Sequence, residues 1–351
     1  MIVLGIETSC DETAAAIVED GRILHSSVIA SQADLHSKFG GVVPEIASRE
    51  HIKAITPTVN TALKEANMEL ADIDAIAVTA GPGLIGALLV GVSYAKSLAI
   101  ASGKPLYAAH HIAGHTAANF VAFPELEPPF VSLVVSGGHS HIYLVDDYTS
   151  FKTLGRTRDD AAGEAFDKVS RAIGLGYPGG PKIDKMSQGG DRNWLEFPES
   201  NLSGNQLDFS FSGVKTAALN LINQLEMRAS KTGEEVWDKY SLSDFCASFQ
   251  ASIVDVLVKN TVKATEEAGL DKIVIAGGVA ANSELRKQFE IVCAERGWQF
   301  FAPPIKYCTD NALMIASLGG LMIEAGFETA GIELDAKATV DIDDFSQQTA
   351  W

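Results

Sequence analysis

The sequence predicts a two-lobed α/β protein, and three observations carry this prediction. The 351 residues are 46% hydrophobic, which is enough to build two packed units. A strand, a polar turn and a second strand occur at the N-terminus and again at 130–145. Elsewhere, apolar strand patterns alternate with longer helical patterns, as in a mixed sheet covered by helices.

The first lobe begins with a strand at 2–8, the polar turn Ser9–Glu12, a second strand at 13–19 and a third after Asp20–Gly21. Asp11 and Glu12 lie at the tip of the first turn. Carboxylates at such a position in a nucleotide site orient a metal-bound water, a phosphate or an attacking group. The alternative is an exposed acidic turn.

A strand at 75–79, an apolar helix at 84–101 and a shorter helix at 110–122 follow. The longest uncharged stretch, 75–95, contains four glycines and a proline, which favours a strand, a turn and a packed helix over a membrane span. The N-terminal apolar run lacks the basic start of a signal peptide. The four cysteines form no C-x-x-C pair. We therefore expect a soluble, cytoplasmic protein without a membrane segment.

A histidine pair is the first candidate for chemistry. His111 and His115 are four residues apart on the shorter helix, so both imidazoles can reach one metal ion, although two hydrogen-bonded core or cap histidines look the same in a sequence. Asp310 is the best oxygen donor for a third ligand, but the residues alone favour a role as N-cap of a helix at 312–325. A zinc protease would carry a glutamate directly after the first histidine, but this position is Ile112. Water activation is therefore not provided on this helix.

Glycine-bearing turns of the second lobe are the next candidates. Ser136-Gly137-Gly138 follows a strand and offers backbone N–H groups to an oxyanion or phosphate, but a glycine pair is equally common in an ordinary turn. Asp159 to Asp184 combines carboxylates with chain-bending residues, which suits ribose hydroxyls or a surface loop. A strand at 273–276 runs through Gly277-Gly278 into a helix at 282–296, whose first residue, Asn282, either contacts a nucleoside or caps the helix.

The charge restricts the partners. The net charge of −18 repels a phosphate backbone at long range. If the substrate is a nucleic acid, the attraction must come from partner subunits or from a local basic stretch, for which 151–192 is the best candidate.

Seven segments together resemble the TsaD family of tRNA threonylcarbamoyl-adenosine synthases, formerly described as glycoproteases. They are 5–13, His111-Ile-Ala-Gly-His115, 134–139, 159–181, 209–215, 277–282 and Cys308-Thr-Asp-Asn311. The match runs in order over nearly the whole chain. It implies the actin and hexokinase (ASKHA) fold, with two lobes around a nucleotide cleft. We expect a first lobe of 1–109 plus about 310–351 and a second lobe of 110–309.

The resemblance also implies a reaction. Threonylcarbamoyl-adenylate, made by another enzyme, binds the protein, and the exocyclic amine of adenosine 37, just 3′ of the anticodon, attacks its carbamoyl carbon and releases AMP. The tRNA substrates read codons that begin with A. The implied partners are TsaB, a shorter paralogue that pairs with the first lobe, and TsaE, an ATPase.

Site residues follow from the same resemblance. His111, His115 and Asp310 match the ligands of one divalent metal, Fe²⁺ first and Zn²⁺ second. The contacts to the bound intermediate match Val134, Val135, Ser136, Gly137, Gly138, Asp167, Gly180, Asp184 and Asn282. Asp11 is the residue that we expect to position the attack. A mixed anhydride is already activated, so it needs a polarised carbonyl and oriented reactants more than a strong base.

Two other functions compete with this hypothesis. One is a metallopeptidase, and the other is a sugar-kinase-like or chaperone-like ATPase that binds and hydrolyses ATP. The products distinguish the three: AMP with modified tRNA, cut peptide bonds, or ADP without tRNA.

Overall fold

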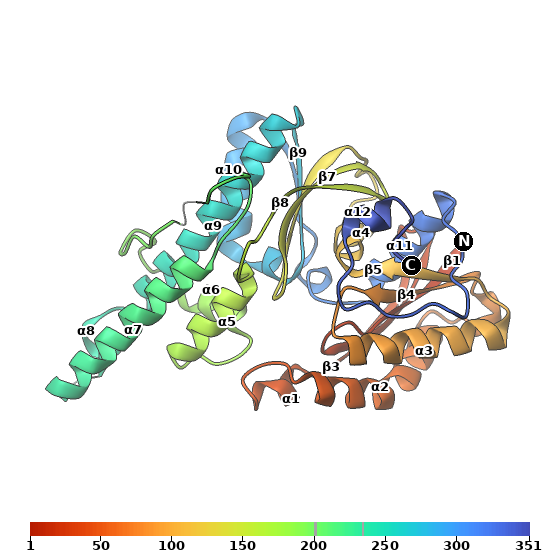
Figure 1. Ribbon diagram of the computed structural model, residues 1–351, viewed down its shortest axis with the longest axis horizontal. Coiled ribbons are helices and arrows are strands. Elements are labelled where there is room, and N and C mark those ends of the chain that lie inside the picture. The colour runs from red at the N-terminus through yellow and green to blue at the C-terminus, as the bar shows by residue number, and fades with distance from the viewer. Residues whose placement is uncertain (200–201, 234) are drawn as a thin grey trace. The chain divides into compact units, whose positions relative to one another are not determined.

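The computed structural model describes residues 1–199, 202–233 and 235–351, which form two units (Figure 1). Unit 1 comprises Met1–Phe130, Leu144–Thr153 and Phe301–Trp351, and unit 2 comprises Val131–Tyr143 and Leu154–Phe300. Positions 200, 201 and 234 of the predicted second lobe lie outside the described residues.

A five-stranded sheet of order β3-β2-β1-β4-β5 forms the centre of unit 1. Its strands are β1 (Ile2–Glu7), β2 (Glu12–Glu19), β3 (Ile23–Ser31), β4 (Ala75–Gly81) and β5 (Leu106–His110). The first three strands are antiparallel neighbours, whereas β1, β4 and β5 run parallel. The predicted strand, turn and strand unit is thereby confirmed, and the turn at its tip holds residues 8–11.

Helices cover both faces of this sheet. Leu4 and Ile6 of β1 join an apolar cluster with α2 (Pro44–Glu65) and α3 (Ile85–Ser102). Gly5 points to the opposite face, as strand alternation requires, and meets α11 (Leu313–Glu324). The remaining helices of the unit are α1 (Ala33–Ser37), the 3₁₀ helix η1 (Leu70–Asp72), α4 (His111–Ala122), the 3₁₀ helix η3 (Ile305–Tyr307) and α12 (Ile342–Ser346).

Strand β1 and helix α11 approach each other closely at Gly5. A Cβ at this position would lie 2.5 Å from the carbonyl oxygen of Ala312 and 2.5 Å from the amide nitrogen of Ala316. Both are backbone atoms, so no rotamer change relieves the clash. Glycine is therefore required here by the packing of α11 on the sheet.

Helix α3 is the one helix among the described residues that is long and apolar enough to cross a membrane. One of its faces packs on the sheet and on α2, and its Ala87 carbonyl accepts a hydrogen bond from Thr8 Oγ1 at 3.0 Å. These contacts show that one face of α3 is packed on the rest of unit 1, which agrees with the packed helix expected from the sequence.

A second sheet, of order β10-β9-β6-β7-β8, repeats the first. Its strands are β6 (Phe130–Val135), β7 (Ser140–Asp147), β8 (Ser150–Arg156), β9 (Lys272–Ala276) and β10 (Gln299–Phe301). Taken from β8 to β10, the order matches the order from β3 to β5 in unit 1. Like β1 and β4, β6 and β9 are parallel. The duplication predicted from the sequence is confirmed.

Most helices of unit 2 lie between β8 and β9 in the chain, and the last two lie between β9 and β10. They are α5 (Ala162–Ala172), α6 (Gly179–Met186), α7 (Ser212–Thr232), α8 (Val236–Lys239), α9 (Leu242–Glu267), the 3₁₀ helix η2 (Gly278–Ala281) and α10 (Ser283–Arg296). Helix α6 packs on both α5 and α9, and α10 packs on α9.

The two units have different bounds from the lobes expected from the sequence. Helix α4, which the sequence assigned to the second lobe, belongs to unit 1. It follows β5 without an intervening residue and packs against α11. The chain therefore leaves unit 1 only after α4, returns to it for Leu144–Thr153, and returns again from Phe301.

Candidate metal centre and glycine-lined site

Helix α4 presents His111 and His115 on one face. Their ring centroids are 4.7 Å apart with an interplanar angle of 77°, the result of a spacing of one helical turn. Both side chains are buried. His110 is the N-cap of α4, and its ring nitrogen Nδ1 accepts a hydrogen bond from the Ala113 amide. The capping role expected for a histidine here is therefore filled by His110 and not by His111 or His115.

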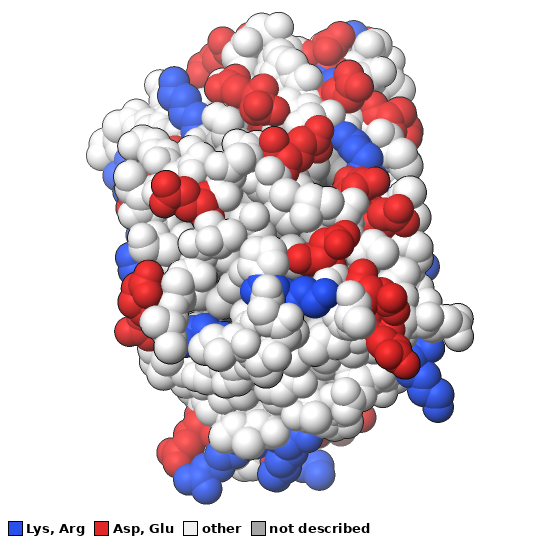
Figure 2. All heavy atoms as spheres, turned by 90° about the vertical axis from the view of Figure 1, so that its right-hand side faces the viewer, with Lys and Arg blue, Asp and Glu red and all other residues white. Residues whose placement is uncertain are grey.

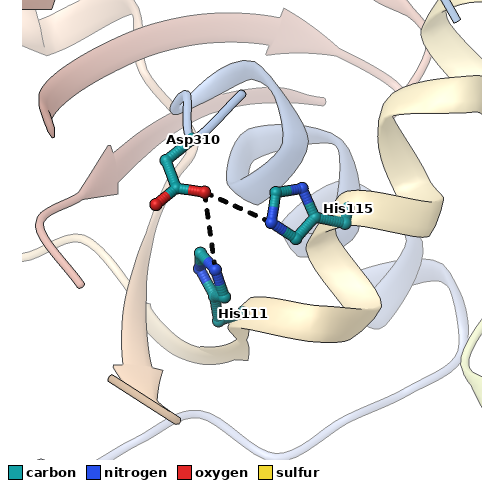
Figure 3. Close-up of side chains that lie close together, drawn as sticks. All are labelled: His111, His115 and Asp310. Atoms are coloured by element: carbon teal, nitrogen blue, oxygen red, sulfur yellow. Dashed lines mark ion pairs between the residues drawn. The ribbon is translucent and has the colours of Figure 1, made fainter. Parts of the chain in front are cut away.

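Asp310 joins the pair from the loop before α11 (Figure 3). Its Oδ1 lies 3.6 Å from Nε2 of His111 and 3.2 Å from Nε2 of His115. Asp310 is not the N-cap of α11, because the N-cap is Ala312. The side chain that accepts from the Met314 amide, at 3.0 Å, is that of Asn311. The three predicted metal ligands are thus brought together, with one donor atom from each within 4.8 Å of the others.

Among the described residues, neither ring nitrogen of His115 makes a hydrogen bond, although both are buried, and Nε2 is contacted only by the Asp310 carboxylate. A buried polar atom without a partner costs about 1–3 kcal/mol, and a bound cation removes that cost at Nε2. Two imidazoles and one carboxylate with room for further ligands form a donor set typical of zinc and of non-haem iron. The residues therefore fit a divalent metal.

Glu7, which was not predicted as a site residue, contacts His111 at the ring nitrogen that faces away from Asp310. Its Oε2 lies 3.3 Å from Nδ1 of His111 and accepts a hydrogen bond from Thr79 Oγ1 at 2.6 Å. Carboxylates that hold the second nitrogen of a metal-bound histidine are common partners in metal sites. A charged residue at the end of the otherwise apolar strand β1 is the signal that identifies it.

The electrostatics of the centre favour a cation. Burial alone raises the pKa of Glu7, but the charge and hydrogen bond of His111 lower it overall. Burial alone lowers the pKa of His111, yet Asp310 and Glu7 outweigh it and raise this pKa to about 9. The two carboxylates thus stabilise positive charge at this position.

The tip of the first hairpin carries two half-buried carboxylates. Burial raises the pKa of Asp11, and the charge of Asp310 adds to this shift. Burial also raises the pKa of Glu12 to about 8, against a hydrogen bond from Ser31. The tip is therefore not the exposed acidic turn of the alternative interpretation.

In unit 2, the turn after β6 leaves two amides available. The Ser136 amide donates to the His139 carbonyl at 2.8 Å, so this member of the predicted anion-binding strip is already used. Within the described residues, the amides of Gly137 and Gly138 donate no backbone hydrogen bond. Val134 and Val135 are buried in β6, where their side chains belong to the core.

Four glycines of unit 2 have space around them. A Cβ added to any of them would meet no atom within 4 Å, and their φ angles lie outside the left-handed range; they are Gly137, Gly138, Gly180 and Gly278. Neither packing nor backbone conformation requires glycine at these positions. These positions have room for a ligand that approaches the backbone closely, which is a use for glycine.

The polar residues that were predicted to contact the intermediate make hydrogen bonds within unit 2. Asp167 accepts from the Gly179 amide at 2.6 Å at the start of α6, and Asp184 accepts from the Ser283 hydroxyl at 2.7 Å. Asn282 accepts from the Leu285 amide at 2.9 Å, which confirms its role as a helix cap. The side-chain nitrogen Nδ2 of Asn282 donates to Oε1 of Gln250 at 2.7 Å.

The basic stretch 151–192 is less available to a polyanion than its composition suggests. Lys168 pairs with Asp160 at 3.2 Å and with Glu164 at 2.6 Å. Arg192 pairs with Asp255 at 2.6 Å and with Glu284 at 3.2 Å. These two cations are therefore largely neutralised within unit 2.

Comparisons with known proteins agree with the resemblance. Residues 23–317 match the family model TsaD, described as tRNA N6-adenosine threonylcarbamoyltransferase. A protein of that name from Clostridium botulinum (strain 657 / Type Ba4) is 58% identical over 315 residues, which are 90% of each chain. Another from Caldicellulosiruptor bescii is 52% identical over 326 residues, with 93% and 94% of the two chains covered.

Solved structures of low sequence identity share the fold. HypF of T. kodakarensis aligns with 92% of this chain and 48% of its own at a TM-score of 0.62 and 13% identity. Component A of the (R)-2-hydroxyglutaryl-CoA dehydratase of Acidaminococcus fermentans aligns with 93% of this chain and 99% of its own at a TM-score of 0.52 and 14% identity. The predicted α/β fold of the actin and hexokinase class is confirmed.

Proposed function

The chain belongs to the TsaD family of tRNA N6-adenosine threonylcarbamoyltransferases, and from this premise we propose a reaction and a division of labour between its residues. The protein is a transferase that modifies tRNA. The single observation that carries this function is the identity of 52% to 58% to relatives of that name over most of both chains. Neither the peptidase nor the ATPase alternative is favoured.

The reaction transfers threonylcarbamoyl from its adenylate to N6 of adenosine 37. The amine nitrogen forms a bond to the carbamoyl carbon, the bond from that carbon to the phosphate oxygen breaks, and AMP leaves. The amine gives up one proton. Because the donor is an anhydride, the protein has to orient two substrates and stabilise charge on oxygen rather than supply a strong base.

His111, His115 and Asp310 would hold the metal in unit 1, Fe²⁺ first and Zn²⁺ second. A bound divalent ion supplies Lewis acidity that polarises a substrate oxygen. Glu7 orients the ring of His111 from its second nitrogen. Asp11 is half-buried at the hairpin tip, where its carboxylate is our candidate for orienting the attacking amine.

The open glycines of unit 2 would bind the adenylate. The free amides of Gly137 and Gly138 are donors for its oxygens. Asp167, Asp184 and Asn282 position the surrounding helices, and any contact that they make to the nucleoside is additional to the hydrogen bonds described above.

We expect Gly138→Val to weaken adenylate binding by about tenfold or more, because the new side chain fills space that the protein itself does not use. Calorimetry with AMP measures the affinity. The metal content and the melting temperature should stay at wild-type values, since no protein atom lies within 4 Å of the added Cβ. An unchanged affinity for AMP would exclude this turn from the nucleotide site.

A partner subunit is expected because the chain itself is poorly suited to attract tRNA. Its net charge is −18, and acidic side chains are spread widely over the face drawn in Figure 2. With Lys168 and Arg192 paired, partners have to supply much of the attraction to the phosphate backbone. By family resemblance, we propose TsaB and TsaE for this role, in the cytoplasm where tRNA is found.

Helices α2 and α3 offer the best surface for TsaB. Their outer face exposes large apolar residues, among them Ile52, Ile85 and Leu89. The two helices approach closely beside these residues, since a Cβ on Gly86 would lie 2.6 Å from Ser48 Oγ. Exposed apolar groups on adjacent helices are typical of a protein interface.

Leu89→Asp is expected to weaken the binding of TsaB by about tenfold or more, because it buries a charge in an apolar interface. Met227→Asp is the matched control, since Met227 is an exposed apolar residue on α7 of unit 2. Calorimetric titration of each variant with TsaB measures the effect. Equal affinities for the two variants would place the partner elsewhere.

The function itself is tested by reconstitution. Purified protein, its partners, threonylcarbamoyl-adenylate and unmodified tRNA are combined, and the digested nucleosides are analysed by mass spectrometry. Threonylcarbamoyl-adenosine together with an equal amount of AMP is the expected result. Peptide cleavage, or ADP formation without modified tRNA, would contradict the proposal.

A further inference from the structure

His51 connects helix α2 to the tip of the first hairpin, and none of the chemistry described above uses it. The side chain is fully buried on the inner face of α2. Its Nε2 lies 3.0 Å from the carbonyl oxygen of Cys10, and its Nδ1 lies 2.7 Å from Thr13 Oγ1. Burying an imidazole in an apolar core costs free energy, and the two hydrogen bonds of its ring nitrogens offset this cost.

The two contacts assign the proton on the ring. A carbonyl oxygen only accepts, so the N–H must be on Nε2 and point to Cys10, while Nδ1 accepts from the Thr13 hydroxyl. Burial lowers the pKa of His51, which keeps the ring neutral in this tautomer. The imidazole therefore spans Cys10 and Thr13, on either side of Asp11 and Glu12.

The other side of Asp11 is also held. The amide of Gln32 donates to the Asp11 carbonyl at 3.1 Å. The Gln32 side chain is buried and donates to the Ala47 carbonyl at 3.3 Å, which ties it to α2 as well. His36 Nε2 lies 3.1 Å from Gln32 Oε1. Both peptide groups that flank the Cα of Asp11 are therefore fixed by hydrogen bonds.

We propose that His51 is a positioning residue of the transfer reaction: by fixing the carbonyl of Cys10 from α2, it sets the direction in which the Asp11 carboxylate points. Two fixed peptide groups leave Asp11 only its side-chain rotations, so the carboxylate is preorganised before the substrates bind. This inference rests on the proposed function, because Asp11 has a task only if the transfer occurs.

The contacts of His51 also predict which substitutes work. A glutamine at this position has its Nε2–H₂ at nearly the same distance from the backbone as the imidazole Nε2, so it can still donate to Cys10. A leucine has a similar volume but no donor. The hydrogen bond to Cys10 is thus separated from the packing of the side chain.

The experiment compares His51→Gln and His51→Leu in the complete complex with partners, tRNA and threonylcarbamoyl-adenylate. We expect His51→Leu to lower kcat by about tenfold to a hundredfold, because small displacements of a positioning group have effects of this size. The KM for the adenylate and the metal content should stay within about twofold of wild type. His51→Gln should keep most of the wild-type kcat.

Val59→Ala is the matched control, since Val59 is buried on the same helix and packs in the core without contacting the tip. It should lower the melting temperature without lowering kcat. If His51→Leu does not fold, His51→Asn replaces it, because its shorter side chain places the amide away from Cys10.

The inference is overturned if a folded His51→Leu keeps its kcat, if His51→Gln loses as much as His51→Leu, or if Val59→Ala loses equally. Failure of the proposed function looks different, because the wild-type complex would then form no threonylcarbamoyl-adenosine at all.

Discussion

Replacing His111 and His115 together by alanine is expected to remove the metal and reduce transfer by about a thousandfold. The two rings supply two of the three donors within 4.8 Å of one another, and a single carboxylate does not hold a divalent ion tightly in water. Lewis-acid stabilisation is worth several kcal/mol, and about 4 kcal/mol corresponds to a thousandfold. Elemental analysis and single-turnover transfer measure the two effects.

Graded and control variants sharpen this prediction. Glu7→Gln keeps all three ligands and should lower the metal affinity by only about tenfold to a hundredfold, as partners of ligating histidines do. His25→Ala removes a histidine that pairs with Glu19 on the surface and should retain the full metal content. Stoichiometric metal in a folded double variant would show that the ion is bound elsewhere.

Gly5→Ala is expected to destabilise unit 1 by about 3 kcal/mol, at the upper end of the range for overpacked cores. The methyl group would lie 2.5 Å from backbone atoms of α11, so the helix has to move away from the sheet. For a unit of this size the melting temperature should fall by about 10 °C. Because Asp310 lies three residues before the start of α11, the metal affinity should fall as well.

The control for this prediction is Gly180→Ala, where the added methyl group meets no atom within 4 Å. Thermal unfolding of the two variants, followed by circular dichroism, gives the comparison. Equal melting temperatures would mean that α11 adjusts to the methyl group at little cost.

The strands and most helices were predictable because their patterns are local. β1, β4 and β6 are short apolar runs that end in glycine or polar turns, and the histidine pair on α4 is identified by a spacing of one helical turn. The sequence alone did not decide the role of Asp310, because Asp310 and its neighbour Asn311 are both good capping residues. Only the positions of the two side chains show that Asn311 accepts from the Met314 amide, whereas Asp310 lies beside the histidines.

Other features depend on contacts between segments that are distant in the sequence. Glu7 meets His111 only after β1 and α4 are packed in one unit, so no local pattern indicates the pair. The same is true of the glycines, because Gly5 is required by the backbone of α11 whereas Gly138 has empty space beside it. The same holds for α4, whose packing on α11 in unit 1 is not indicated by its own residues.

Unit 1 is formed by separate stretches of the chain, so its parts are synthesised at different times. The ribosome releases His111 and His115 first, then the whole of unit 2, and only afterwards the segment from Phe301 that contains Asp310 and α11. Until that segment emerges, one face of the first sheet lacks its covering helix and the nascent chain holds an incomplete set of donors. A translation product that ends before Asp310 therefore lacks one of the three donors of the proposed metal site.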